Sequence, residues 1–267
     1  MKKFKNFDEY IQIVSVAQKN KLNNINCYLM PDEIKSLINA EKLSYLCNEN
    51  TLQLVVENQR YCKIYFYGNL DFEFIPFKTD KPILTDLAYS NVKTPNFLNL
   101  QNKFADLGFC INSSVTRMDC NNFDNYNCKE TQFIVDKLQK EEIDEVYNLW
   151  EENFDFVESL LYGKDEIINL LNQIYVLKDK QNHIYGAMEL IINNNVAWIQ
   201  KIAIKKAYQG KGLGAVLENF CLNKCKTLGI KKILLYTVDS NLNAQSFHKK
   251  FGFKPDGKFN CQYIKRR

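Results

Sequence analysis

The sequence has no long apolar run and no CxxC pair, although it contains nine cysteines. A membrane-spanning helix needs about 20 consecutive apolar residues, and no stretch approaches that length, so we expect no membrane association. The opening MKKFKNFDEYIQIV has basic residues with no apolar run behind them, so we expect no secretory signal peptide. Cysteines without paired spacing indicate a reduced, cytoplasmic protein.

Charge of one sign is also not in strong excess, because 35 Lys and Arg against 31 Asp and Glu give a net charge of +4. Nucleic-acid-binding domains usually cluster basic residues on one face, so we expect no nucleic-acid partner. Cys221 and Cys225 lie four apart on a predicted helix, and neither histidine is near them in sequence. We interpret them as small apolar residues and expect no metal site.

A polar, turn-prone stretch over 119–128 marks the clearest change in composition along the chain. The chain has 267 residues, of which 46% are hydrophobic and 13% aromatic. That length suits one large domain or two of ordinary size, each with a core of its own. We therefore predict two domains, 1–118 and 132–267, joined by a linker over 119–131.

Hydrophobic periodicity in the second half alternates between strand and helix. It predicts strands at 132–138, 174–178, 184–192, 196–204, 232–238 and from 253 onward, and helices at 141–153, 165–173, 241–251 and from Leu213. The predicted fold class is α+β, with a mixed, mostly antiparallel sheet flanked by helices.

The first half echoes part of this order. A hairpin is expected over 52–56 and 61–67, the segment 83–91 resembles 233–241, and 104–109 resembles 248–253. Two interpretations stay open. The first half is a degenerate internal repeat, or two α/β segments share the order of strand, helix and Gly-Phe by chance. The first half has no counterpart of QGKGLG, so we do not expect it to hold the same ligand.

The segment Gln209-Gly210-Lys211-Gly212-Leu213-Gly214 lies between a predicted strand and an amphipathic helix. Unpaired N–H groups at a helix N-terminus attract phosphate, glycines allow close approach, and Lys211 adds positive charge. The nucleotide-binding GK[ST] loop is missing, and no GxGxxG opens a βαβ unit. From these residues alone, a pyrophosphate site and a glycine-rich helix start without ligand both remain open.

Two motifs together resemble the GNAT superfamily of acetyl-CoA-dependent N-acetyltransferases. Ile202-Ala203-Ile204 followed by Gln209–Gly214 is similar to the family's core motif, Gln/Arg-x-x-Gly-x-Gly/Ala. The segment from Asn241 to Phe253 matches Asn-x-x-Ala-x-x-Φ-Tyr-x-x-Φ-Gly-Phe at every marked place but one. The resemblance covers about half of the chain.

The resemblance implies acetyl-CoA as the acyl donor and assigns roles by motif position. In the family, the strand matching Ile202, Ala203 and Ile204 pairs through its backbone with the pantetheine arm, beside a slot for the thioester. The turn takes the pyrophosphate, and Asn241 matches a residue that often bonds the pantetheine region. The implied cofactor-binding residues are Ile202, Ala203, Ile204, Gln209, Gly210, Lys211, Gly212, Leu213, Gly214 and Asn241.

His248 stands where most members of the family have tyrosine. That tyrosine lies near the sulfur and can protonate the leaving thiolate. Asn241 and His248 are seven residues apart, so they are expected to share a helix face, and imidazole transfers protons near neutral pH. We predict His248 as the catalytic acid; the alternative is a histidine at the surface or at a helix cap.

The general base is not identified by the motifs. Some members of the family use a glutamate on the fourth or fifth strand, where this chain has Trp198 and Tyr236. Glu189, Gln200 or Tyr236 could relay a proton through water. We expect Trp198, Gln200 and Tyr236 to line the acceptor site, with further walls from 150–162 and near Tyr263.

The predicted function is transfer of an acetyl group from acetyl-CoA to a primary amine of a small molecule or protein. Two alternatives stay open. One is an aminoacyl or longer-acyl transferase of tandem type, and the other is a CoA-binding regulatory module with little catalysis. The sequence is compatible with a homodimer but does not determine one.

Overall fold

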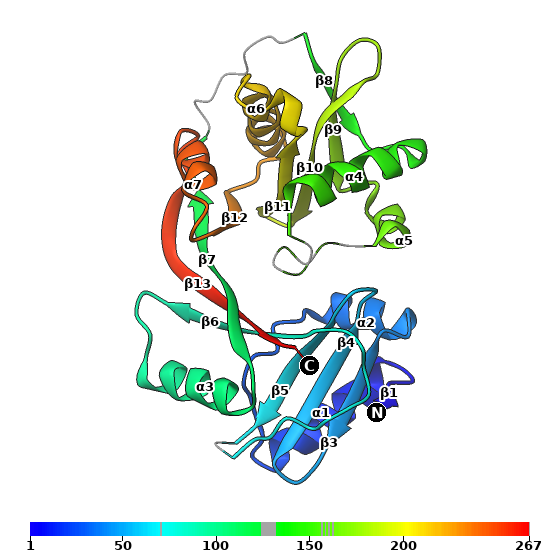
Figure 1. The fold of residues 1–267 in the computed structure, drawn as a ribbon, viewed down its shortest axis with the longest axis vertical. Coiled ribbons are helices and arrows are strands. Elements are labelled where there is room, and N and C mark those ends of the chain that lie inside the picture. The colour runs from blue at the N-terminus through cyan, green and yellow to red at the C-terminus, as the bar shows by residue number, and fades with distance from the viewer. Residues whose placement is uncertain are drawn as a thin grey trace. The chain divides into compact units, whose positions relative to one another are not determined.

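The protein is described by a computed structural model, shown in Figure 1. It describes residues 1–69, 71–123, 132–155, 157, 159, 161 and 163–266. The chain forms two compact units, Met1–Ser114 with Asn260–Arg267, and Val115–Phe259. The strands β7 and β13 (green and red in Figure 1) each contribute residues to both units.

The first unit is built around a mostly antiparallel sheet. Its elements are β1 (Lys2–Lys3), α1 (Phe7–Lys19), β2 (Asn23–Asn24), α2 (Pro31–Asn39), β3 (Leu43–Cys47), β4 (Thr51–Glu57), β5 (Cys62–Gly68), β6 (Ile83–Ser90), α3 (Pro95–Asp106) and the start of β7 (Cys110–Cys120). Side-chain caps define where two of its helices begin: Asn6 accepts from the N–H of Glu9 before α1, and Thr94 accepts from Phe97 before α3. Strand β5 runs parallel to β6 and antiparallel to β4.

The second unit has the strand order β7-β12-β11-β10-β9-β8. Only β11 and β12 in this run are parallel. Its elements are the end of β7, β8 (Ile134–Lys137), η1 (Lys140–Glu142), α4 (Ile143–Asn153), α5 (Lys164–Ile167), η2 (Ile168–Leu170), β9 (Ile174–Lys178), β10 (Ile184–Asn193), β11 (Val196–Ile204), η3 (Lys206–Tyr208), α6 (Leu213–Thr227), β12 (Lys232–Val238), α7 (Leu242–Lys249) and the start of β13 (Lys254–Lys265).

Helices pack on both faces of this second sheet. The apolar stripe of α6, including Leu217, Cys221 and Cys225, packs against residues such as Ile199 and Leu235. Residues of α4, including Trp150, pack on the other face against residues of β9, β10 and β11 such as Val176, Ala187 and Ala203. Period-two alternation of side chains along each strand supplies both cores.

The predicted fold class is confirmed, because the sheet is mixed and mostly antiparallel with helices on its faces. The predicted helix over 165–173 is wrong in length. It ends at Ile167 and continues only as the short 3₁₀ helix η2. The Ile and Asn residues of this segment favour an α-helix only weakly. The segment after Phe253 forms one strand, β13.

The predicted domain limits of 1–118 and 132–267 remain a prediction. The compact units have other limits because β7 and β13 are shared between them. Of the predicted linker, 124–131 lie outside the described residues. Cys221 and Cys225 are buried in the α6 core, and the described part of the chain contains no cluster of three His, Cys, Asp or Glu suited to a metal ion. No described helix is long and apolar enough to cross a membrane.

A candidate acyl-donor and acceptor site

The parallel strands β11 and β12 separate part-way along their length. Val196–Ile199 pairs with Lys232–Leu235, and this pairing does not extend to Gln200–Ile204 or to Tyr236–Val238. Beyond the last pair, β11 stays bonded to β10 and β12 stays bonded to β7. We call this opening between the two strands the fork. Its walls are main-chain groups that a ligand can pair with, as an added strand would.

A β-bulge sits where the fork begins. Leu190 of β10 pairs with Ile199, and Glu189 pairs with Lys201, so Gln200 is an extra residue in β11. The bulge reverses the direction of the side chains that follow. Ile199 packs in the α6 core, whereas Lys201 lies on the α4 face and forms a buried 3.0 Å ion pair with Glu189.

The turn after β11 has the conformation that its glycines predict. Gly210 has φ of +76° and Gly212 has φ of +82°, and a Cβ at either place would meet no atom within 4 Å. The five N–H groups from Gly210 to Gly214 donate to no acceptor in the described part of the chain. Unpaired donors at the start of α6, in open space, form a cradle suited to a pyrophosphate.

Side chains around the turn hold it against β11 and α4. Nε2 of Gln209 donates to the carbonyl of Ile204 at 3.0 Å and to Oδ1 of Asn153 at 2.7 Å. Nζ of Lys211 lies 4.9 Å from the centre of the Tyr208 ring, on the exposed rim of the turn. The turn is therefore anchored at Gln209 and keeps a positive charge beside its open N–H groups.

Asn241 and His248 have different surroundings on α7: Asn241 caps the start of the helix, whereas His248 is buried. Oδ1 of Asn241 accepts from the N–H of Ala244 at 3.0 Å and caps the helix, so contact with a ligand would fall to its amide nitrogen. His248 is only 4% exposed. Its Nδ1 lies 3.4 Å from Oε1 of Glu218 on α6, and its ring packs against Phe253. The predicted catalytic role of His248 stays a prediction.

Glu218 is a functional candidate that the sequence analysis did not name. It is completely buried, and its Oε2 has no hydrogen-bond partner among the described residues. The sequence could have indicated this, because Glu218 follows Leu217 and precedes Cys221 by three residues, so helical spacing places a charged side chain in the buried stripe of α6. A buried carboxylate needs a partner, and His248 supplies it.

The residues predicted for the acceptor site lie at the start of the fork. The rings of Trp198 and Tyr236 stack with centroids 5.8 Å apart and planes at 24°. Tyr236 is 43% exposed, and Gln200 is exposed. The structure also places Arg117 there, with its guanidinium 5.9 Å from the Trp198 ring centre. Sequence reasoning missed Arg117 because it lies on β7, far away along the chain.

Two further predicted walls of the acceptor site have other locations. Trp150 is 2% exposed in the α4 core. Tyr263 is 1% exposed and packs in the first unit against Phe104, with ring centroids 5.3 Å apart, so its assignment to the acceptor site is wrong. Tyr162 lies outside the described residues.

The first unit has an equivalent fork, but its own chain fills it. Strands β5 and β6 pair only at Cys62 with Ile83 and Lys63 with Leu84. Beyond that point β2 pairs with the end of β5. Next to it, Asn26 is fully buried: its Oδ1 accepts from the N–H of Phe66 at 2.8 Å, and its Nδ2 donates to Thr85 Oγ1 at 2.7 Å and to the carbonyl of Asp86 at 2.9 Å.

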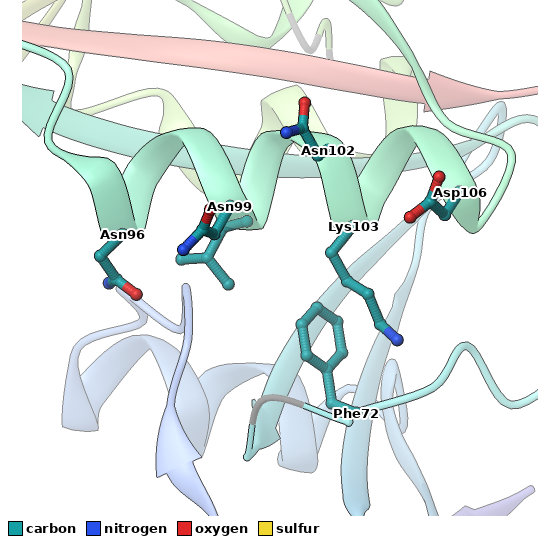
Figure 2. A pocket seen from close by; sticks show the side chains of 7 residues that line it. Phe72, Asn96, Asn99, Asn102, Lys103 and Asp106 are labelled. Atoms are coloured by element: carbon teal, nitrogen blue, oxygen red, sulfur yellow. The ribbon is translucent and has the colours of Figure 1, made fainter.

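The first unit also lacks a phosphate-binding turn in its described residues. Between β5 and β6, residues 71–82 contain no helix, whereas the second unit has α6 between β11 and β12. A small pocket does open beside α3, lined by Phe72, Asn96, Asn99, Leu100, Asn102, Lys103 and Asp106 (Figure 2). It contains none of the predicted site residues.

The fork, the bulge and the glycine turn together form the candidate site, in which an opening between two strands is followed by a turn with unpaired N–H groups. The model of the Acetyltransferase (GNAT) family matches residues 143–253. A Bacillus subtilis (strain 168) protein, a candidate N-acetyltransferase for an alanine of ribosomal protein bS18, is 30% identical over 128 residues, covering 48% of this chain and 85% of that protein. The chain belongs to the GNAT family of acetyltransferases.

Solved structures share this fold over most of the chain. A GCN5-related N-acetyltransferase from Sphaerobacter thermophilus has a TM-score of 0.59 at 12% identity, covering 89% of this chain and 86% of that one. A tandem GNAT protein from the clavulanic acid biosynthesis pathway has a TM-score of 0.54 at 9% identity, covering 80% and 78%. At such identities the likeness shows the fold alone. The family model and the Bacillus subtilis relative make the chain an N-acetyltransferase by family.

Proposed function

We propose that the second unit transfers an acetyl group from acetyl-CoA to a primary amine of a small molecule or protein. The observation that carries this proposal is the open fork followed directly by a turn with five unpaired N–H groups. The two features suit the two ends of one ligand: an extended amide-containing arm for the fork and a pyrophosphate for the turn.

The residues of the chain bind and orient the donor in this proposal. Main-chain groups of Ile202, Ala203 and Ile204 pair with its arm, and the N–H groups from Gly210 to Gly214 hold its phosphates. Lys211 adds charge at the rim, and the amide nitrogen of Asn241 reaches the arm from α7. When bound, acetyl-CoA supplies a thioester carbonyl activated for attack by an amine.

In the transfer, the amine nitrogen forms a bond to the acyl carbon, and the carbon–sulfur bond breaks. The nitrogen loses one proton and the sulfur gains one, so the products are an amide and free CoA thiol. We assign the proton donation to His248. In this step the ring is protonated on both nitrogens: Nε2–H supplies the proton to sulfur, while Nδ1–H donates to Glu218, which fixes the ring on α7. Alignment of amine and thioester supplies most of the acceleration.

We propose that the first unit is a degenerate copy of the fold that binds no donor. Its fork is filled by Asn26 and the adjoining β2, and its described residues have no helix between β5 and β6. The eight described cysteines are free thiols, which supports a cytoplasmic location.

One observation favours a second candidate function, a CoA-binding module with little catalysis. The two places where family members carry a glutamate base hold Trp198 and Tyr236. A longer-acyl or aminoacyl transferase of tandem type is a third candidate, supported by the fold shared with a tandem GNAT protein.

The decisive experiment combines a binding and a chemical measurement. Acetyl-CoA should raise the melting temperature, because only the folded state holds the site. A panel of small amines and peptide N-termini should then release free CoA thiol. Absence of stabilisation at saturating acetyl-CoA would refute the proposal. Stabilisation without thiol release by any amine would favour the CoA-binding module.

A further inference from the structure

Four side chains cross one face of the second sheet as a continuous row. Trp198 on β11, Tyr236 on β12, Arg117 on β7 and Asp256 on β13 lie on successive strands, on the face opposite α6. Tyr236 and Arg117 are direct cross-strand partners. Nε and Nη2 of Arg117 donate to the same oxygen of Asp256 at 2.8 and 2.5 Å. We call these four residues the aromatic row.

The aromatic row begins where the fork opens. Trp198 pairs with Leu234 inside the paired region, and Tyr236 is the first residue of β12 beyond it. The stacked rings therefore stand at the place where an acyl group in the fork would meet its acceptor. Their exposure, with 43% of Tyr236 open to solvent, leaves aromatic surface for another flat group.

The charged side chains around the row already form ion pairs with one another. Arg117 occupies the position of a cation beside the Trp198 ring. Asp256 is paired with Arg117, and Asp119 on the same face of β7 is paired with Lys232 at 3.0 Å. Although burial alone would raise it, hydrogen bonds from Arg117 hold the pKa of Asp256 below its ordinary value. Nothing in this arrangement favours an acceptor with several positive charges.

We infer that the acceptor is an arylalkylamine, a primary amine joined to an aromatic ring through a short alkyl chain. The ring stacks on Trp198 and Tyr236 while the amine enters the fork. This inference rests on the proposed function and names its substrate class. The reaction is the one proposed above: a C–N bond forms, the C–S bond breaks, and the nitrogen loses one proton while the sulfur gains one.

Tryptophan emission tests the binding without any acyl transfer. The chain has two tryptophans, and Trp150 is 2% exposed, so an added ligand acts mainly on the emission of Trp198. Titration of 2-phenylethylamine into the full chain should change the emission saturably, at concentrations about tenfold lower than spermidine or butylamine require. Equal or stronger binding of spermidine or butylamine would overturn the inference.

Steady-state kinetics give the second test. Trp198→Leu and Tyr236→Leu should each raise KM for 2-phenylethylamine about tenfold, with a much smaller rise in KM for butylamine and KM for acetyl-CoA nearly unchanged. The same substitution at Tyr28, an exposed tyrosine of the first unit, is the matched control and should change none of the three. A parallel rise in KM for both amines would overturn the aromatic preference.

The two proposals fail in different ways. If acetyl-CoA neither stabilises the protein nor yields thiol, the proposed function is wrong, and the emission titration still decides whether the aromatic row binds a ring. If thiol is released equally well with butylamine and 2-phenylethylamine, the proposed function stands and the inference about the acceptor is wrong.

Discussion

Replacing Gly212 by alanine separates the shape of the turn from the stability of the helix. Gly212 precedes α6 at φ of +82°, and an added Cβ would meet no atom within 4 Å. The substitution therefore creates no clash, and its cost comes from the left-handed backbone alone. Gly229, just past the other end of α6, offers a matched control, because its φ is +67° and its added Cβ also meets no atom.

The expected magnitude follows from these dihedrals. A non-glycine residue in the left-handed region costs about 1–2 kcal/mol, which lowers the melting temperature by roughly 2–8 °C for a protein of this size. Both Gly212→Ala and Gly229→Ala should show this loss. Relief of the strain at Gly212 also turns the N–H groups of the cradle away from their common direction, so only Gly212→Ala should weaken acetyl-CoA binding.

The assay is a melting curve of wild type and both variants, with and without acetyl-CoA. At about one hundred times Kd, the ligand stabilises the folded state by about 2.7 kcal/mol. A tenfold loss of affinity at the same concentration would reduce this to about 1.4 kcal/mol. Gly229→Ala should keep the full ligand-dependent shift. Equal ligand-dependent shifts in the two variants would refute the assignment of the turn to the pyrophosphate.

Two further predictions concern His248 and Asn26. His248→Gln should lower kcat by about 10²-fold or more, as loss of a general acid does, with the acetyl-CoA melting shift preserved; an unchanged kcat would make His248 a structural partner of Glu218. Asn26→Leu leaves the buried N–H of Phe66 and carbonyl of Asp86 unpaired, each at about 1–3 kcal/mol, so urea unfolding should show lost stability. Calorimetry should still find one acetyl-CoA per chain in Asn26→Leu, and a second equivalent in the wild type would contradict the filled fork.

Local patterns were enough to predict the elements around the site. The strands β9, β11 and β12 begin and end where the runs of β-branched and aliphatic residues predicted. The glycine turn was placed correctly between β11 and α6, because glycine tolerates the positive φ that Gly210 and Gly212 adopt. Burial of Cys221 and Cys225 likewise follows from helical spacing.

Features set by pairing between distant strands were not predictable in this way. The bulge at Gln200 depends on the register of β11 with β10, and the residues around Gln200 do not predict that register. Arg117 meets Trp198 only because β7 lies beside β12. The role of Asn26 could not be predicted from its neighbours, since its three hydrogen-bond partners lie 40 to 60 residues away in sequence.

The filled fork of the first unit has a consequence for motion. Amides such as that of Phe66 are hydrogen-bonded to the chain itself, so their hydrogen exchange should be slow whether or not acyl-CoA is present. The N–H groups from Gly210 to Gly214 have no such partner in the described chain, and their protection would rise and fall with the acyl-CoA concentration. One half of the protein would thus keep a constant rigidity, while the other would reflect the supply of activated acyl groups.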